Sequence, residues 1–133
     1  DVREVEHSHV NYVVADTGAW EQQAAYRLDT HPAVEAFVKN AGLGLAIPYL
    51  DDGRYHDYLP DFVVRLRGDE PITLILEIKG FDRREEVKRG AAERWVRAIS
   101  ADRQHGRWAY AVVKDIGALD RVIDEAAART LPA

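Results

Sequence analysis

Three charged residues at the ends of two strand-like segments have the types and spacing needed to bind a divalent cation. Asp61 stands immediately before the apolar run FVV, and Glu77 and Lys79 end the run ITLILEIK. Side chains alternate between the two faces of a strand, so Glu77 and Lys79 should point the same way. Carboxylates held close together repel each other, more strongly when buried, unless a proton or a cation neutralises one of them.

A short connection over residues 68–71, GDEP, joins the two segments and favours antiparallel pairing between them. Pairing across a turn centred between the second and third of these residues places Asp61 opposite Ile78, with Glu77 and Lys79 as its neighbours. Mg²⁺ in proteins is commonly held by one or two carboxylates, with waters and phosphate oxygens completing its shell. We therefore expect Asp61, Glu77 and the main-chain carbonyl of Ile78 to bind Mg²⁺, for which Mn²⁺ can substitute.

Lys79 would then be placed to orient or deprotonate a water, or to stabilise negative charge on a phosphate. The tripeptide EIK taken alone has a simpler interpretation, a local charge pair at a strand end, with Asp61 as an acid beside a turn. The position of Asp61 at the start of an adjacent predicted strand is the observation that favours a metal site.

Glu21 is a further candidate acid. It lies on a predicted helix over 17–29, where the spacing of four and seven residues places it on the same side as Ala25 and Leu28. An acid on the core side of a helix needs a partner, which a site with a cation would supply. The alternative is that Glu21 only favours the positive end of the helix dipole, since it lies in the first turn.

The predicted elements that must position these residues describe one α/β domain. A helix precedes three strands joined by short turns, and a long amphipathic helix then leads to a further strand, which should join the sheet parallel to a neighbour. This order predicts a mixed central β-sheet, a three-strand antiparallel meander plus a parallel strand, flanked by helices on both faces. Residues 33–40 fit a short helix or a strand equally well. The other predicted strands cover 9–16, 45–50, 56–66, 72–79 and 107–114, and the other predicted helices cover 83–103 and 117–130.

The composition limits the class of protein. A chain of 133 residues with 47% hydrophobic and 31% charged residues is expected to form a single domain, 1–133, and no apolar run is long enough to span a bilayer. The absence of cysteine excludes disulfides and agrees with a reducing cytoplasm. The absence of methionine favours a domain cut from a longer polypeptide.

The charge is unevenly distributed, although the chain is acidic overall with a formal net charge of −5. Half of the 18 basic residues lie within residues 79–107, and such a segment can contact phosphate groups in an otherwise acidic protein. A charged helix face is also a common solubility device, and composition leaves the two interpretations open. The candidates for DNA binding on the long helix are Lys88, Arg89, Arg94 and Arg97.

Pro60-Asp61 followed by Glu77-Ile78-Lys79, after a helix that carries Glu21, resembles the PD-(D/E)xK nuclease superfamily. That resemblance implies a restriction-endonuclease-like αβββαβ core, in agreement with the predicted order of elements. The segments YLPDFVVRL, LILEIKGF and AAERWVRA, together with 9–49, are similar to the C-terminal endonuclease domain of the Res subunit of type III restriction enzymes and related helicase-linked nucleases.

The resemblance implies roles for four residues. Asp61 and Glu77 would be metal ligands, Lys79 the catalytic lysine and Glu21 an auxiliary acid, with possible further roles for Gln22 and Arg94. It also implies a helicase or ATPase domain in the same parent chain, a methyltransferase (Mod-type) subunit as a partner, and a bacterial or archaeal cytoplasm.

The leading hypothesis is a Mg²⁺-dependent DNA endonuclease domain that hydrolyses phosphodiester bonds by a metal-activated water. Contacts to backbone phosphates position DNA without reading its sequence, so we expect weak, salt-sensitive binding with little sequence specificity. The competing hypothesis is a catalytically silent nuclease fold that docks onto a helicase or methyltransferase partner. A third keeps the chemistry but changes the substrate to RNA or branched DNA.

Overall fold

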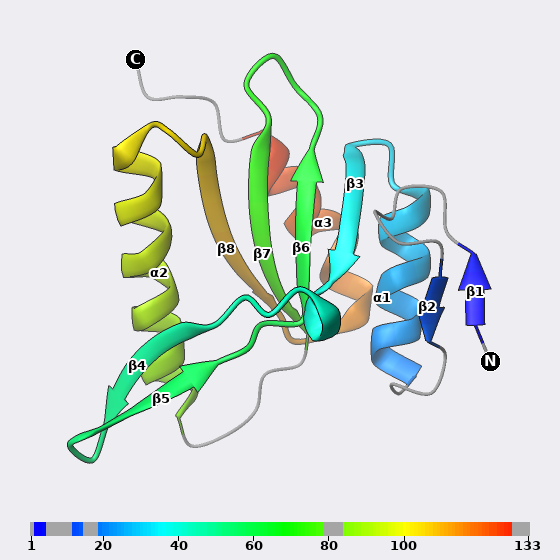
Figure 1. The fold of residues 1–133 in the computed structure, drawn as a ribbon. Coiled ribbons are helices and arrows are strands. Elements are labelled where there is room, and N and C mark those ends of the chain that lie inside the picture. Colours follow the sequence, from blue (N-terminus) through cyan, green and yellow to red (C-terminus); the bar gives the residue numbers. More distant parts are fainter. Residues whose placement is uncertain (1, 5–11, 15–18, 79–83, 129–133) are drawn as a thin grey trace.

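The structure is a computed structural model that describes residues 2–4, 12–14, 19–78 and 84–128. A four-stranded sheet stands at its centre and carries helices on both faces, and a two-stranded hairpin projects from one end of the sheet (Figure 1). The predicted α/β class with a mixed sheet and helices on both faces is therefore confirmed.

The central sheet has the order β3-β6-β7-β8. β3 (Val34–Lys39), β6 (Phe62–Leu66) and β7 (Ile72–Ile78) form an antiparallel meander, and β8 (Arg107–Val113) pairs parallel to β7. The parallel strand after a crossover helix was predicted, because a chain that returns through a helix runs in its original direction. β7 is buried on both faces over most of its length, which explains its almost continuous apolar sequence, whereas β6 buries Phe62, Val64 and Leu66 on one face and exposes Arg65 on the other.

The first strand of the meander differs from the prediction. Residues 45–50 were expected in that position, but β4 (Ile47–Asp51) pairs only with β5 (Arg54–Tyr58), in a separate hairpin. β3, in the segment that fitted a helix or a strand, takes its place beside β6. Local propensity does not decide between a helix and a strand over residues 33–40. The segment is a strand because it pairs with β6, whose paired residues lie 23 to 32 positions later in the chain.

The predicted strand over 56–66 is also wrong in extent, since it is divided between β5 and β6. Pro60 lies in the gap and has no N–H to donate to a strand ladder, so the chain can change direction there. The turn of the hairpin is formed by Asp52 and Gly53. Asp52 and Gly53 have φ angles of 52° and 71°, and two positive φ values in succession are the requirement of the tight turn that Asp-Gly favours.

Helices cover the two faces of the sheet with separate apolar clusters. α1 (Ala19–Thr30) and α3 (Leu119–Ala127) pack on one face, and α2 (Glu85–Asp102) packs with the β4–β5 hairpin on the other. The predicted helix 117–130 begins as a 3-10 turn, Ile116–Ala118, before α3. No helix in the described part of the chain is both long and apolar enough to cross a membrane.

Two further strands, β1 (Val2–Glu4) and β2 (Tyr12–Val14), form a small antiparallel sheet of their own. β2 lies within the strand predicted over 9–16. The first two residues of the helix predicted over 17–29 lie outside the described residues, as does Lys79.

Candidate active site

Asp61 lies at the end of the central sheet where β3 and β7 finish and β6 begins, which is the lower end in Figure 1. Its carboxylate Oδ2 accepts a hydrogen bond of 2.7 Å from the main-chain N–H of Ile78. Its own carbonyl oxygen accepts a hydrogen bond of 2.9 Å from the N–H of Asn40. Asp61 is therefore held from both neighbouring strands, and one of its carboxylate oxygens is already engaged.

Glu77 lies beside Asp61 across the β6–β7 ladder. Phe62 pairs with Leu76, so extending the ladder by one residue places Asp61 opposite Glu77. The prediction placed Asp61 opposite Ile78. The difference of one residue arises because the turn is centred on residue 69. Residues directly opposite each other project their side chains from the same face. The Glu77 oxygen Oε1 is buried and has no hydrogen-bond partner among the described residues.

Glu21, the predicted auxiliary acid, approaches the same end of the sheet from α1. Its Oε1 lies 3.6 Å from the Nζ of Lys39, at the end of β3, and both side chains are more than three-quarters buried. Its charge raises the pKa of Asp61, which shows that the two acids are close enough to interact. The prediction that Glu21 faces inward beside Ala25 and Leu28 is confirmed, since both apolar residues are fully buried.

The pKa values of the two strand carboxylates are raised. Burial is the largest cause for Glu77 and the negative charge of Asp61 is the second, and together they raise its pKa to about 7. A hydrogen bond from Tyr58 and the charge of Lys88 act in the opposite direction. The pKa of Asp61 is raised mainly by burial, with the charge of Glu21 adding to it and the Ile78 N–H and Lys39 opposing it. Among the described residues of the site, the three acids Asp61, Glu77 and Glu21 outnumber the two cations Lys39 and Lys88, and a bound divalent ion would relieve this excess of negative charge.

The candidate ligands for a metal ion are the carboxylates of Asp61 and Glu77 and the main-chain carbonyl of Ile78. No three His, Cys, Asp or Glu side chains in residues 2–4, 12–14, 19–78 and 84–128 are arranged to hold a metal. The buried, unpartnered Oε1 of Glu77 is nevertheless an atom that a cation would satisfy, and carboxylate oxygens are the ligands that Mg²⁺ prefers. Asp61, Glu77 and Ile78 therefore fit an ion that keeps several waters or phosphate oxygens in its shell.

The predicted DNA-binding residues of α2 do not form one continuous surface. Lys88 lies at the carboxylates, with its Nζ 5.5 Å from the centre of the Tyr58 ring. Arg89 is engaged with two acids of its own helix, Glu85 at 3.9 Å and Glu86 at 3.7 Å. Lys88 is therefore the only one of the four that the described structure places beside Glu77.

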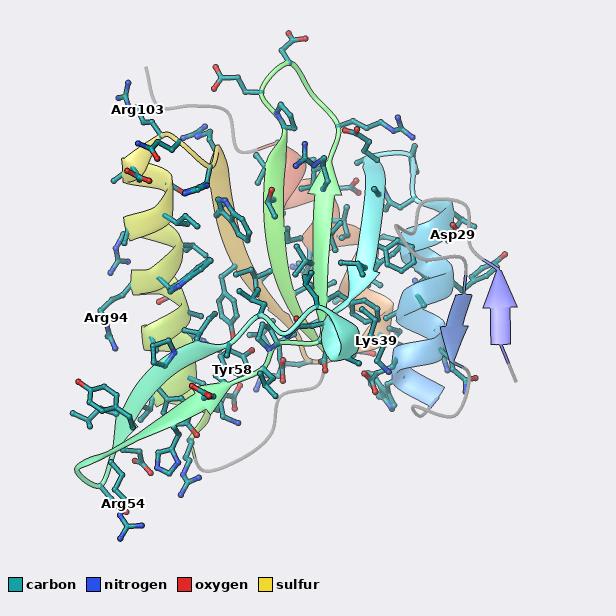
Figure 2. The ribbon with its side chains drawn as sticks, in the orientation of Figure 1. Asp29, Lys39, Arg54, Tyr58, Arg94 and Arg103 are labelled. Carbon is teal, nitrogen blue, oxygen red and sulfur yellow. The ribbon has the colours of Figure 1, made fainter. Side chains whose placement is uncertain are left out.

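The remaining candidates lie apart from the carboxylates. Arg94 is exposed on the outer side of α2 (Figure 2), with its guanidinium near Gly90 of the preceding turn, and Arg97 lines a groove of about 1430 Å³ with Arg103 and Arg107. Gln22 lines a different groove, between α1 and α3. The structure does not bring Gln22 or Arg94 to Asp61.

Three residues of the site were not predicted from the sequence. Lys39 contacts Glu21, and the hydroxyl groups of Tyr58 and Tyr110 lie 2.9 Å apart beside Glu77. Tyr58 precedes Asp61 by only three residues, so its proximity could have been inferred from the sequence. Lys39 and Tyr110 are brought to the site by the β3–β6 and β7–β8 pairings, which no local motif signals.

Comparisons with protein-family models, with curated proteins and with solved structures found no match to this chain. The function of the site is therefore inferred from its geometry and from the residues that form it.

Proposed function

We propose that this chain is a Mg²⁺-dependent endonuclease domain that hydrolyses phosphodiester bonds of DNA. The observation that carries the proposal is the pair Asp61 and Glu77, opposite each other at a sheet end, with a buried oxygen of Glu77 that lacks a partner among the described residues. Burial raises the pKa of both carboxylates, and carboxyl groups with raised pKa values are common at functional sites.

The order of the elements supports the same proposal. Apart from the β4–β5 hairpin inserted between β3 and β6, the elements α1, β3, β6, β7, α2 and β8 have the αβββαβ order of restriction-endonuclease-like cores. Asp61 immediately precedes the second of these strands and Glu77 lies on the third, where the motif PD-(D/E)xK requires its acids. We assign this chain to that superfamily as part of the proposal.

In the proposed reaction each residue has a defined task. A bound Mg²⁺ would lower the pKa of water and stabilise charge on the phosphate. Asp61, held by the Ile78 N–H, and Glu77 would bind the ion, while Lys88 lies on the α2 side of Glu77 as a cation for the substrate. Glu21 and Lys39 form a pair that adjusts the charge around Asp61. Lys79 remains the proposed catalytic lysine.

The likeness to type III Res domains extends the proposal to the parent protein. We propose that the domain follows a helicase motor in a restriction enzyme, with a Mod-type methyltransferase as partner. DNA is the proposed substrate, and RNA and branched DNA are the alternatives that a substrate panel would separate.

The test is metal binding and plasmid nicking by the purified chain, compared with the variant Asp61→Asn. We expect the wild type to bind Mn²⁺ or Mg²⁺ in calorimetry and to nick plasmid. The variant should lose metal binding, and its nicking should fall by about 100-fold or more, the loss that misplacing reacting groups causes. Asp57→Asn is the matched control, because Asp57 is exposed on β5 and the charge change is the same.

The possible outcomes separate the hypotheses. Metal binding without nicking would retain the site and indicate that a motor or partner must present the DNA. Indifference of the wild type to both metals, with DNA present, would contradict the proposal and favour the docking module.

A further inference from the structure

Two tyrosines from distant parts of the chain meet behind Glu77. Tyr58 ends β5 and Tyr110 lies in β8, and their hydroxyl oxygens are 2.9 Å apart. Their rings pack edge to face with centroids 6.2 Å apart, and Tyr58 is only 3% exposed. A buried hydroxyl pair of this kind fixes the direction in which each O–H group points.

The ring of Tyr58 is also held by α2, since the Nζ of Lys88 lies over its face. The Tyr58 side chain thus belongs to the apolar cluster between the β4–β5 hairpin and α2, and it also contacts Tyr110 of β8 and Lys88 of α2. Few rotamers satisfy all three contacts, so the position of the Tyr58 hydroxyl is determined by packing rather than by Glu77.

The hydroxyl of Tyr58 also lies beside the Glu77 carboxylate, to which a phenol can donate a hydrogen bond. Burial, followed by the negative charge of Glu77, raises the pKa of Tyr58 far above its usual value, and burial raises that of Tyr110 to about 12. Tyr58 therefore restrains the Glu77 carboxylate, while Oε1 is left without a partner among the described residues.

We propose that Tyr58 is a positioning residue that orients the Glu77 carboxylate for a divalent cation, with Tyr110 holding the Tyr58 hydroxyl in place. This inference rests on the proposed function in one respect, that Glu77 binds the metal. Groups that hydrogen-bond to a metal ligand restrict its orientation, and removing them commonly weakens metal affinity by about 10- to 100-fold.

The test is the Mn²⁺ affinity of Tyr58→Phe, measured by calorimetry beside the wild type and Glu77→Gln. The substitution removes only the hydroxyl and retains the ring that packs in the core. We expect affinity to fall by about tenfold. Tyr49→Phe is the matched control, because Tyr49 is a buried tyrosine of the same hairpin whose hydroxyl contacts Arg84. Its Mn²⁺ affinity should equal that of the wild type.

A double-mutant cycle tests the role of Tyr110. Tyr110→Phe should weaken Mn²⁺ binding less than Tyr58→Phe, and it should have no further effect when Tyr58 is already Phe, because Tyr110 acts through the Tyr58 hydroxyl. Thermal unfolding of each variant separates a loss of fold from a loss of orientation. If Tyr58→Phe does not fold, the single variant Tyr110→Phe carries the same test.

The outcomes distinguish this inference from the proposed function. Binding by the wild type and loss in Glu77→Gln, with unchanged affinity in Tyr58→Phe, would overturn the positioning role alone. Absence of Mn²⁺ binding by the wild type would overturn both. If Tyr58→Phe and Tyr49→Phe weaken Mn²⁺ binding equally, the loss arises from a less stable hairpin. That result would also overturn the positioning role.

Discussion

Glu77, the proposed metal ligand, carries an energetic cost in the metal-free fold. Its pKa is raised from 4.5 to about 7, by burial first and by Asp61 second, so at neutral pH the folded chain holds a proton that the unfolded chain releases. Between these two pH values the folded state binds more protons. The free energy of unfolding must therefore fall as pH rises from about 4.5 to 7.

The first prediction concerns this pH dependence. Glu77→Gln removes the titrating group but keeps its size and polarity, so the metal-free variant should be more stable than the wild type at pH 8 and have a flatter pH profile. The gain should be at most about 3 kcal/mol, since each pKa unit corresponds to about 1.4 kcal/mol. Urea unfolding at a series of pH values measures it.

The control for this experiment is Glu35→Gln, a charge-matched change at an exposed position of β3. It should leave the pH profile unchanged. A wild-type protein whose stability rises steadily over the same pH range would contradict the assignment of Glu77 as a raised carboxyl group.

At the scale of the elements, the basic residues of α2 divide into two groups along its length. Its first turns provide Lys88 beside the carboxylates, while Arg89 is paired with acids of the same helix. Further along, Arg94 and Arg97 are exposed, and Arg97 shares a groove with two other arginines. In the proposed endonuclease, the later turns would therefore suit contact with phosphates beyond the bond to be hydrolysed.

The second prediction is that the variant with both Arg94→Glu and Arg97→Glu binds DNA more weakly at every sequence. Each lost phosphate contact reduces the slope of log affinity against log salt by about 0.9, so the slope should fall by about two. Fluorescence anisotropy over a range of salt concentrations measures both quantities. Mn²⁺ affinity should not change.

The comparison variant is Arg121→Glu on α3, which is exposed and lies on the opposite face of the sheet. It makes a charge change of the same sign and should preserve the salt slope. Equal losses in the two variants would indicate a general charge effect instead of a contact surface on α2.

The position of the β4–β5 hairpin was not predicted from the sequence. It was expected to begin the central sheet, yet it forms a separate arm that packs Ile47, Tyr49 and Tyr58 against α2. Through Tyr58 this arm reaches Glu77. The hairpin is therefore part of the site, although its turn and its two strands read as ordinary sheet structure.

At the scale of the whole molecule, two apolar clusters share one sheet. Leu74 and Ile75 are consecutive residues of β7, both fully buried, and they face opposite clusters. Neither cluster can lose its packing without exposing the sheet that both cover. The described fold should accordingly unfold as one cooperative unit.

The third prediction tests that cooperativity. Leu74→Ala and Ile75→Ala should each reduce the free energy of unfolding by about 2–5 kcal/mol, the usual result of deleting a buried aliphatic side chain. Both should leave the urea m-value unchanged, and near-UV and far-UV circular dichroism should report the same transition. Separate transitions in either variant would show that the two faces fold independently.

Much of this architecture could be predicted from the chain because it depends on local physical rules. Strand alternation and the short turn at 68–71 bring Asp61 and Glu77 together, and the helical spacing turns Glu21 inward. The parallel strand β8 follows from the crossover helix before it. These inferences needed only spacing, turn chemistry and connection rules, so the class of fold and two neighbouring acids were already determined by the amino-acid sequence.

Tertiary structure alone decided the rest. Residues 33–40 became β3 because a strand partner was available in β6, and this placed Lys39 beside Glu21. The parallel pairing of β7 with β8 brought Tyr110 to Tyr58 across 52 residues of chain. Contacts of this kind arise from the free energy of burying surfaces that are distant in sequence, and no local pattern encodes them.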